Sequence, residues 1–525
     1  MKKICIIIFL GLLIYSFGLF NGFVWDDEVM FQKTASISNT AYFRPAISAV
    51  YSTIHNIFGF QPFFFHFFQL IFHIATAILI FYLFKRFFKE TISFFLALIF
   101  LVHPVSVEAV SFASAMQEVT FTFMGIIGLY LFVDRDVINH VSTKYMDFPK
   151  VFLATSVLLI GLLMKETAIV FFVLVFYYLV LFKKNNRVVL ISYSIFAVIL
   201  LMAYFLFRFS GGNLYVQGQG LFPIMRVSLT TRLMNIPSII QYYLSIFFFP
   251  INLAIAQHWV IKSPSFINFF LPLILEVLLF LTAVIYSIKK KDKIFAFFFL
   301  WFLIGLLPHL QIIALNMTVA ERWLYFPLIG LLGMIGAILE EFRIKNLELR
   351  MIFVAVIIIS LFSIRSFVRT LDWRNGLALY GHDIKKTSSF DLQNNMGVEL
   401  FRVGRFDQAK KYFEISTNLA PYWWVNWNNL GAIYEREKNY KKAVDYYQKA
   451  INNGQYYLAY ENLAKILILH GNDQKKTEDF LQIALKLFPE NQNLKQINTY
   501  FQEKINHQLP LLNNNPVAVP RPITR

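Results

Sequence analysis

The sequence is poor in cysteine and in charge. Its 525 residues include a single cysteine, Cys5, so the chain cannot form an intramolecular disulfide. Only 15% of the residues are charged, whereas soluble proteins carry about 25%. The hydrophobic share of 57% and the mean hydropathy of +0.56 exclude a disordered chain as well. A polytopic membrane protein remains.

The common catalytic and metal-binding motifs are also missing. The chain has no HExxH, no CxxC pair, no Walker loop and no GxSxG. Candidate chemistry therefore rests on ionisable residues in unusual places.

The net charge of +17 would indicate nucleic-acid binding only if the basic residues clustered on a soluble surface. Instead, +12 of this charge lies in the first 369 residues, in short groups between apolar runs. These groups are Lys2/Lys3, Lys85/Arg86/Lys89, Arg135/Lys144/Lys150, Lys183/Lys184/Arg187, Lys289/Lys290/Lys291/Lys293 and Arg343/Lys345/Arg350. The positive charge is thus a topology signal, and no nucleic-acid partner is expected.

Eleven apolar runs are predicted to cross the membrane, although several are shorter than the usual 20 or so residues. They are 4–21, 63–84, 92–104, 119–133, 150–164, 166–182, 188–207, 267–288, 293–309, 323–341 and 350–368. With the N-terminus in the cytoplasm, this count places all six basic groups inside. We expect a multi-pass protein of a bacterial cytoplasmic (inner) membrane. Residues 1–21 could instead be a cleaved signal peptide, but no clear small-x-small cleavage site follows them.

The predicted membrane domain, 1–369, has two long outer segments. The first outer loop is 22–62, and a longer segment covers 208–266. An apolar stretch at 237–256 is predicted to lie on the membrane or dip into it, because the topology requires an even number of crossings there. This stretch is a candidate lining for a lipid-tail groove.

The polar remainder of the chain repeats with a period of 34 residues. Trp427, Leu430, Gly431 and Tyr434 fit the tetratricopeptide pattern W-x2-L-G-x2-Y. The pattern predicts a soluble α-solenoid on the extracytoplasmic (periplasmic) side, which binds a protein partner or serves as a spacer.

The boundaries follow from the repeat. We expect a linker at 370–389, three repeats at 390–491, and a helix end with a disordered tail at 492–525. In the degenerate third repeat, Lys465 is expected in place of the glycine.

Three successive carboxylates, Asp26, Asp27 and Glu28, follow the first apolar run. Because their negative charges repel one another, holding them close together requires a compensating partner: a cation, a cationic side chain or a proton to accept. A carboxylate beside a nucleophilic hydroxyl can act as a general base. The alternative is a solvated acidic loop.

Further ionisable or polar residues lie within the predicted spans or at their outer ends, where such residues are costly and often functional. They are Arg44, His73, His103, Glu108, Lys165, Glu166, Arg322 and Tyr325. Lysine can bind phosphate as a point charge and arginine as a fork. The set suits an amphipathic substrate such as a lipid-linked phosphate sugar. The alternatives are polar contacts between helices and, for Lys165 with Glu166, an internal salt bridge.

The order of these motifs resembles a known group of membrane enzymes. The motifs are Gly22 to Glu28, Phe43-Arg44-Pro45, His103-Pro104-Val105 with Glu108, Lys165-Glu166-Thr167 and Glu321 to Pro327. Together with the repeat tail, they look like the GT-C glycosyltransferases that end in tetratricopeptide repeats. Animal transmembrane and tetratricopeptide repeat O-mannosyltransferases belong to this group, with many bacterial relatives.

The resemblance implies an all-α GT-C membrane bundle that uses a polyprenyl-phosphate sugar donor. In that superfamily an acidic residue of the first outer loop is the catalytic base or binds a metal, and Asp26 and Asp27 occupy that position. A Gly-Arg pair usually continues the second-loop motif, but Ala115 and Met116 precede Gln117 here. Any cationic role of that loop therefore shifts to Arg44, Lys165 and Arg322.

We therefore expect inverting transfer of a sugar from a lipid phosphate to an acceptor hydroxyl, of a protein or a glycan, on the outer face. No cofactor is expected; the alternative is Mg²⁺ or Mn²⁺ held by Asp26 and Asp27. Two other functions compete: a membrane-tethered scaffold, and a transporter or ligase for lipid-linked glycans.

Overall fold

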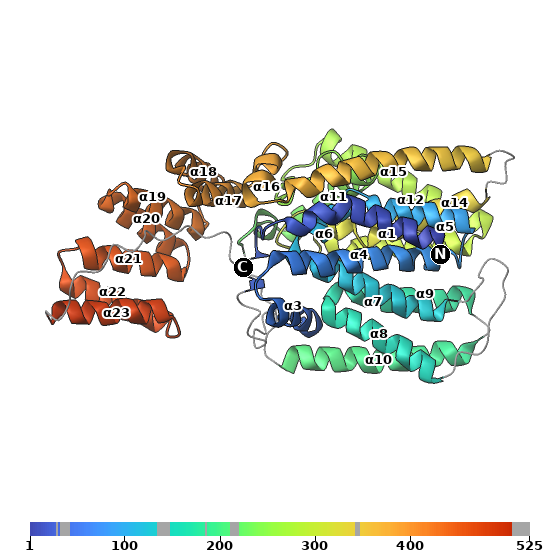
Figure 1. The fold of residues 1–525 in the computed structure, drawn as a ribbon, viewed down its shortest axis with the longest axis horizontal. Helices are drawn as coiled ribbons and strands as arrows, with labels where there is room; N and C mark the ends of the chain where they lie inside the picture. Colours follow the sequence, from blue (N-terminus) through green and yellow to red (C-terminus); the bar gives the residue numbers. More distant parts are fainter. Residues whose placement is uncertain are drawn as a thin grey trace. The chain divides into compact units, whose positions relative to one another are not determined.

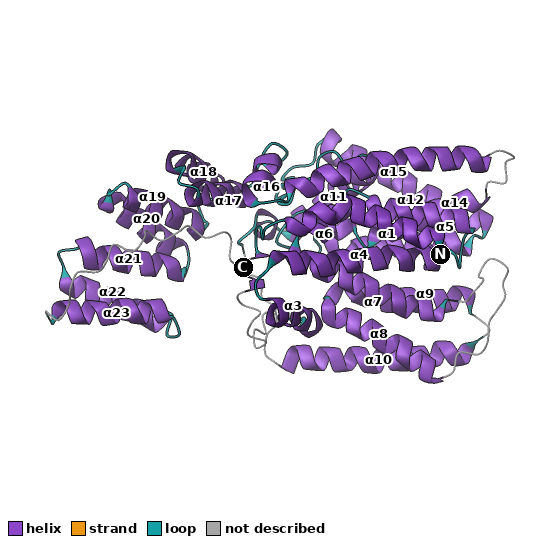
Figure 2. Ribbon diagram, in the orientation of Figure 1, coloured by secondary structure: helices purple, strands orange, loops and turns teal. Residues whose placement is uncertain are grey.

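The computed structural model describes residues 1–27, 30–31, 43–133, 148–183, 186–210, 220–341 and 347–506. Within these ranges the regular structure is helical throughout, and no strand occurs (Figure 2). The chain forms two compact units, Met1–Asn375 and Gly376–Arg525. The prediction of an all-α membrane bundle followed by a helical repeat array is confirmed.

Each expected span coincides with a helix of the first unit. The helices are α1 (Lys2–Tyr15), α4 (Pro62–Phe84), α5 (Glu90–Val102), α7 (Met116–Phe132), α8 (Phe148–Met164), α9 (Ile169–Phe182), α10 (Arg187–Ser210), α12 (Leu271–Lys290), α13 (Lys293–Leu306), α14 (Pro327–Glu341) and α15 (Leu347–Asp372). Six helical segments of the described chain are long and apolar enough to cross a membrane. Figure 1 shows the axes of α4, α10 and α15 lying roughly parallel to one another.

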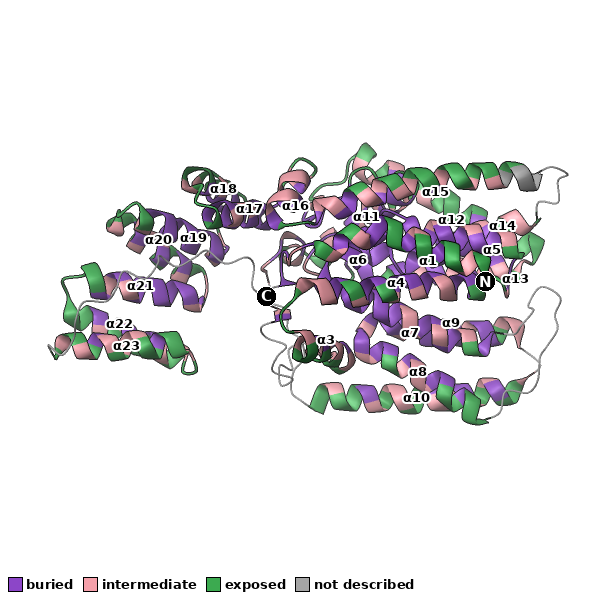
Figure 3. Ribbon diagram, in the orientation of Figure 1, coloured by how far each residue is buried: buried purple, intermediate pink, exposed green. Residues whose placement is uncertain are grey.

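Apolar side chains cover the outside of the bundle. In their most apolar windows, only 11% of the α12 segment and 17% of α15 is buried (Figure 3). Side chains such as Leu279 of α12 and Leu361 of α15 are exposed. A water-soluble protein does not expose such long apolar faces, so lipid must cover them.

Shorter helices lie between the spans. Helix α3 (Pro45–Phe58) buries Ile47, Tyr51 and Ile54, a spacing of four and three residues that marks one helical face. It is drawn nearly end-on in Figure 1 and so crosses the direction of α4. Helix α11 (Leu229–Phe248) begins before the apolar stretch expected at 237–256 and ends within it.

The connection between α5 and α7 is buried in the centre of the first unit. It contains α6 (Ser106–Ser111) and the short 3₁₀ helix η2 (Ala113–Ala115). The Tyr51 hydroxyl donates to the carbonyl of Ala113 at 3.1 Å, and Gln69 Nε2 donates to that of Phe112 at 2.9 Å. These bonds hold the buried connection in place at the break between α6 and η2, and the connection provides side chains for the site described below.

The second unit is a row of helical hairpins. Its helices are α16 (Gly376–Asp383), α17 (Phe390–Arg402), α18 (Phe406–Leu419), α19 (Trp424–Arg436), α20 (Tyr440–Asn453), α21 (Tyr457–His470), α22 (Gln474–Leu487) and α23 (Gln492–Ile505). The pairs α17/α18, α19/α20 and α21/α22 form three hairpins. The segment expected as a linker holds the end of α15 and α16, and 507–525 lies outside the described residues.

Glycine allows the two helices of a hairpin to approach closely. A Cβ atom on Gly397 would lie 2.6 Å from the Phe413 ring, and one on Gly431 would lie 2.5 Å from Tyr447. In the third hairpin Ala464 packs with Leu481 in the equivalent cluster. The expectation that Lys465 replaces this glycine is therefore wrong by one residue, because the first helix of the third repeat is shifted by one position.

Replacing Gly431 with leucine should destabilise the repeat unit by about 1–3 kcal/mol or more, because Tyr447 must move to make room. Gly381 of α16 is the matched control, since a Cβ there meets nothing within 4 Å. Thermal unfolding of the full-length protein followed by circular dichroism measures the difference. Equal behaviour of the Gly431→Leu and Gly381→Leu variants would contradict the packing argument.

Candidate functional site

The acidic residues after α1 are buried. Trp25 has a φ of 59°, a left-handed conformation that costs an aromatic residue about 1–2 kcal/mol. Asp27 is fully buried and accepts three hydrogen bonds: from Val24 N–H at 3.2 Å, from Ser114 N–H at 2.8 Å and from the Ser114 hydroxyl at 2.6 Å. Asp26 keeps 6% of its surface exposed. Glu28 lies outside the described residues.

Burial changes the acidity of Asp27, which lies outside the predicted spans. Its removal from water raises the pKa of the carboxyl from 3.8 to about 7, and the neighbouring charge of Asp26 adds to the rise. The hydrogen bonds from Ser114 and Val24 oppose the shift. The Asp27 pKa therefore lies close to neutral pH.

This pKa predicts a pH-dependent stability. Because the folded-state pKa is above the unfolded value of 3.8, the contribution of Asp27 is fully present below about pH 4 and is lost as pH rises through about 7. The difference in melting temperature between the protein and its Asp27→Asn variant should change across this window and level off above it. A difference independent of pH between 4 and 8 would contradict the raised pKa.

Arg44, the residue before α3, forms a fork with an acid far along the chain. Its Nε and Nη2 donate to the two oxygens of Glu166 at 2.8 and 2.5 Å, and Nη1 donates to Gln117 Oε1 at 2.5 Å. A bidentate pair of this kind fixes both side chains in one orientation. It attaches the first outer loop to the junction of α8 and α9.

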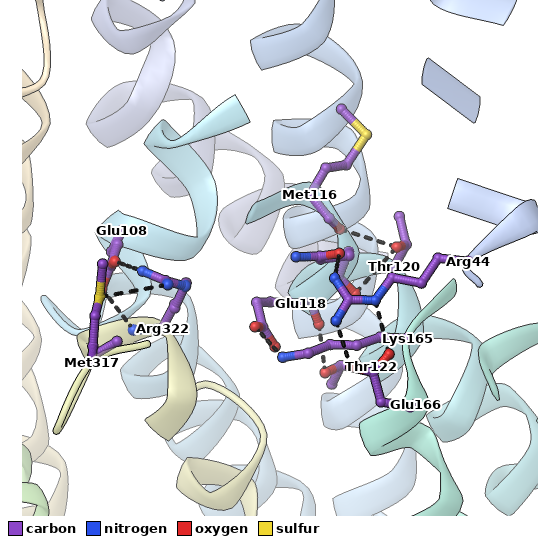
Figure 4. A network of polar contacts seen from close by, with 12 residues as sticks. Arg44, Glu108, Met116, Glu118, Thr120, Thr122, Lys165, Glu166, Met317 and Arg322 are labelled. Atoms are coloured by element: carbon purple, nitrogen blue, oxygen red, sulfur yellow. Dashed lines mark hydrogen bonds and ion pairs between the residues drawn. The ribbon is translucent and has the colours of Figure 1, made fainter. Parts of the chain in front are cut away.

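Two further cations are paired with buried carboxylates (Figure 4). Lys165 binds Glu118, and Arg322 binds Glu108. The Arg322 backbone N–H also donates to Glu108 Oε2 at 2.9 Å. The internal salt bridge between Lys165 and Glu166 is not formed. Each cation has its own carboxylate, so an incoming phosphate must share or displace that partner.

One stretch of chain contacts Asp27 and all three cations. The connection from α6 to the start of α7 provides Glu108 for Arg322, Ser114 for Asp27, Gln117 for Arg44 and Glu118 for Lys165. Residues from four distant parts of the sequence are thus held by one buried segment. We call residues 108–118 the central segment.

The predicted histidines and tyrosine make contacts of a different kind. His73 Nδ1 lies 2.9 Å from the Tyr325 hydroxyl, and its Nε2 lies 3.0 Å from the Leu101 carbonyl. His103 Nε2 lies 3.0 Å from the carbonyl of Phe247, on which its ring stacks. Both histidines connect helices. Each of the ring nitrogens named above has a hydrogen-bond partner.

Several buried polar residues were not among the predicted site residues. Glu321 and Arg369 form a fully buried pair at 3.3 Å. The ring of His309 stacks on Trp323 at 4.8 Å, and its Nδ1 has no hydrogen-bond partner in the described part of the chain. Arg369 could have been predicted, because it lies just beyond an apolar run, as the other candidates do. Ser114 carries no such signal in the sequence.

The described residues contain no group of three or more histidines, cysteines or acids that could hold a metal ion. Asp26 and Asp27 are the carboxylates proposed for that role. A carboxylate offers about four lone-pair positions, and hydrogen bonds already use three of those of Asp27. This residue is thus poorly prepared to coordinate a cation.

Comparison with known families bears on this arrangement. Residues 44–209 match the family described as dolichyl-phosphate-mannose-protein mannosyltransferase, and residues 426–453 match the tetratricopeptide repeat. The chain combines a mannosyltransferase-like membrane region with tetratricopeptide repeats. The resemblance drawn from the motifs is confirmed, and the first match includes Arg44, Glu108, Lys165 and Glu166.

Two curated proteins are similar over parts of their length. The human protein O-mannosyl-transferase TMTC3 is 24% identical over 190 residues, which cover 33% of this chain and 21% of the human protein. The anaphase-promoting complex subunit 3 of Schizosaccharomyces pombe is 38% identical over 85 residues, 16% of this chain and 13% of that protein. The matched regions thus span about a fifth and an eighth of these relatives. Taken together, the matches and the apolar helices support a multi-pass membrane glycosyltransferase.

Proposed function

We propose that this protein transfers a sugar from a polyprenyl-phosphate donor to a hydroxyl group on the extracytoplasmic side of the membrane, with inversion at the anomeric carbon. The observation that carries the proposal is the central segment, which contacts the buried carboxylate of Asp27 and the three cations Arg44, Lys165 and Arg322. The family match at 44–209 supports the donor class and favours mannose as the sugar. A protein serine or threonine, or a glycan, is the acceptor.

The chemistry requires a base and a stabilised leaving group. As the acceptor oxygen bonds to the sugar C1, its proton passes to a carboxylate, and the bond from C1 to the lipid phosphate oxygen breaks on the opposite face. We assign the base to Asp26, because three hydrogen bonds already hold Asp27. Asp27 then positions the loop against Ser114.

The departing phosphate carries negative charge, which preorganised cations stabilise. Arg44, Lys165 and Arg322 provide this charge, and each shares it with a carboxylate: Glu166, Glu118 and Glu108 respectively. These carboxylates keep the cations oriented and neutralised until the donor arrives. His73, His103 and Tyr325 hold the surrounding helices in place.

We further propose that transfer needs no metal ion, since Asp27 has little capacity left for coordination. Treatment with a chelator should leave the rate unchanged. Loss of activity that Mg²⁺ or Mn²⁺ restores would contradict this part of the proposal and assign Asp26 to the ion.

The repeat unit gives the enzyme a surface for its acceptor or for a partner protein, as helical repeat stacks commonly do. The distribution of basic loops supports a cytoplasmic N-terminus and an extracytoplasmic repeat unit. Accessibility of single cysteines introduced into the repeats of a Cys5→Ser background tests this orientation in intact cells. Labelling of the repeats only after the membrane is permeabilised would reverse it.

The function itself is tested by incubating the purified protein with radiolabelled mannosyl polyprenyl phosphate and an acceptor preparation. Labelled acceptor should form, and its anomeric configuration should be opposite to that of the donor. A scaffold forms no labelled product, and a transporter moves the intact lipid-linked sugar across a vesicle membrane without cleaving it.

A further inference from the structure

An apolar groove of about 960 Å³ lies on the membrane-embedded part of the first unit. It is lined by α5, α14 and α15 and by the end of α11, with side chains such as Phe95, Ile335 and Ile358 along its length. Phe247, Phe248 and Phe249 close one end. Because its walls belong to helices that lipid surrounds, a lipid is the natural occupant.

The two ends of the groove differ in charge. The lining residues at the end formed by Phe247, Phe248 and Phe249 include no charged side chain, whereas Lys89 and Arg350 line the opposite end, where α5 and α15 begin. Both cations belong to the basic groups that the charge distribution assigns to the cytoplasm. The groove therefore has a direction, with its cations at the cytoplasmic end.

These two cations are less neutralised than their neighbours. Lys3 and Lys85 pair with Glu90 at 3.0 and 3.1 Å, and Lys290 pairs with Glu341 at 2.5 Å. The Lys89 ammonium lies 3.9 Å from Glu340, and its side chain is 66% exposed. The Glu340 carboxylate also accepts a hydrogen bond from the Lys89 backbone N–H at 3.0 Å.

Arg350 is likewise open. It forms no ion pair with any side chain that the structure describes. The mouth of the groove thus presents positive charge above an apolar channel, which complements a lipid with an anionic head group.

We propose that the groove binds an anionic glycerophospholipid of the cytoplasmic leaflet, with its phosphate between Lys89 and Arg350 and its acyl chains along α5, α14 and α15. The sugar donor is oriented the other way in the membrane, because its phosphate must reach the site on the extracytoplasmic side. The inference rests on the proposed orientation but not on the transfer reaction. A lipid in this position would contact both α15 and α5 and so stabilise their packing.

The test uses the full-length protein in phosphatidylcholine nanodiscs that contain a small fraction of phosphatidylglycerol, with bound lipid measured by native mass spectrometry. The protein should retain phosphatidylglycerol in preference to phosphatidylcholine. The Lys89→Gln/Arg350→Gln variant should lose roughly 30-fold of that preference, about fivefold for each cation near the membrane surface. The matched control is Lys289→Gln/Lys291→Gln, which removes two exposed charges of another basic loop and should leave the preference unchanged.

A second pair of variants tests the acyl-chain path without changing charge. Ala355→Trp narrows the groove and should abolish lipid retention, whereas Val356→Trp, on the exposed face of the same helix, should not. Equal retention of both lipids by the unmodified protein would overturn the proposal. Displacement of phosphatidylglycerol by added polyprenyl phosphate would also overturn it and assign the groove to the donor. The radiolabelled transfer assay, read separately, shows whether the transfer reaction itself fails.

Discussion

Replacing Asp26 with asparagine is expected to lower sugar transfer by about 10²- to 10⁴-fold, the contribution of a general base. The amide has almost the same shape as the carboxylate but cannot accept the proton of the acceptor hydroxyl. The rate of transfer from a radiolabelled polyprenyl-phosphate sugar measures the loss. The apparent affinity for the donor should change little, because the cations that bind it remain.

Asp27→Asn is the matched comparison. An asparagine there can still accept both hydrogen bonds from Ser114 and loses only the bond from Val24 N–H. We expect a loss of about tenfold or less, close to the effect of one neutral hydrogen bond. If Asp27→Asn shows the larger loss, Asp27 is the base. If both variants are folded and active, the site has been assigned to the wrong residues.

Replacing Arg322 with methionine is expected to destabilise the protein by about 3–5 kcal/mol, because it leaves the Glu108 charge buried without its partner. Glu108 is fully buried, and Arg322 is 6% exposed. Thermal unfolding in detergent or nanodiscs measures the change. Transfer should fall as well, since the variant also removes a cation from the phosphate site.

A double variant separates the two effects. Glu108→Gln/Arg322→Met removes the unpaired charge and should recover most of the stability without recovering transfer. The exposed pair of Lys290 and Glu341 is the surface control, and Lys290→Met should leave the melting temperature nearly unchanged. A double variant as unstable as Arg322→Met would show that lost packing, rather than a stranded charge, is responsible.

The spans and the repeats were predictable because each leaves a periodic or continuous signal in the sequence. Continuous apolar runs located the membrane helices, and the spacing of Leu430, Gly431 and Tyr434 located the hairpins. Helix α3 was not predicted, because polar residues separate its apolar residues along the sequence and a search for continuous apolar runs passes over it. The shift at Ala464 was missed because a fixed period cannot follow a one-residue shift that affects only the first helix of a repeat.

The residues of the candidate site stood out individually in the sequence, but their pairing did not. Lys165 and Glu166 are adjacent in sequence, and an internal salt bridge was the natural alternative. Lys165 adopts an extended conformation, φ −157° and ψ 137°, and successive side chains of an extended backbone point to opposite sides. The lysine therefore reaches Glu118 while the glutamate reaches Arg44.

Glu108 of the central segment was among the predicted site residues, but the way the segment contacts the other site residues could not be read from the sequence. Ser114 and Gln117 carry no charge pattern, and their partners lie 87 and 73 residues away. Only the burial of the whole connection brings Asp27 and Arg44 to the same few residues. The departure from the family pattern at Ala115 and Met116 removes a cation from this loop. In the structure, cationic side chains from other segments contact the loop instead.

The most direct measurement is transfer of labelled sugar by the purified protein from a polyprenyl-phosphate donor, compared between the unmodified protein and the Asp26→Asn/Asp27→Asn double variant. We predict labelled acceptor of inverted configuration with the unmodified protein and none above background with the folded double variant. Labelled product from the double variant at the unmodified rate would contradict the central claim. So would no product from the unmodified protein across a panel of polyprenyl-phosphate sugars and acceptors.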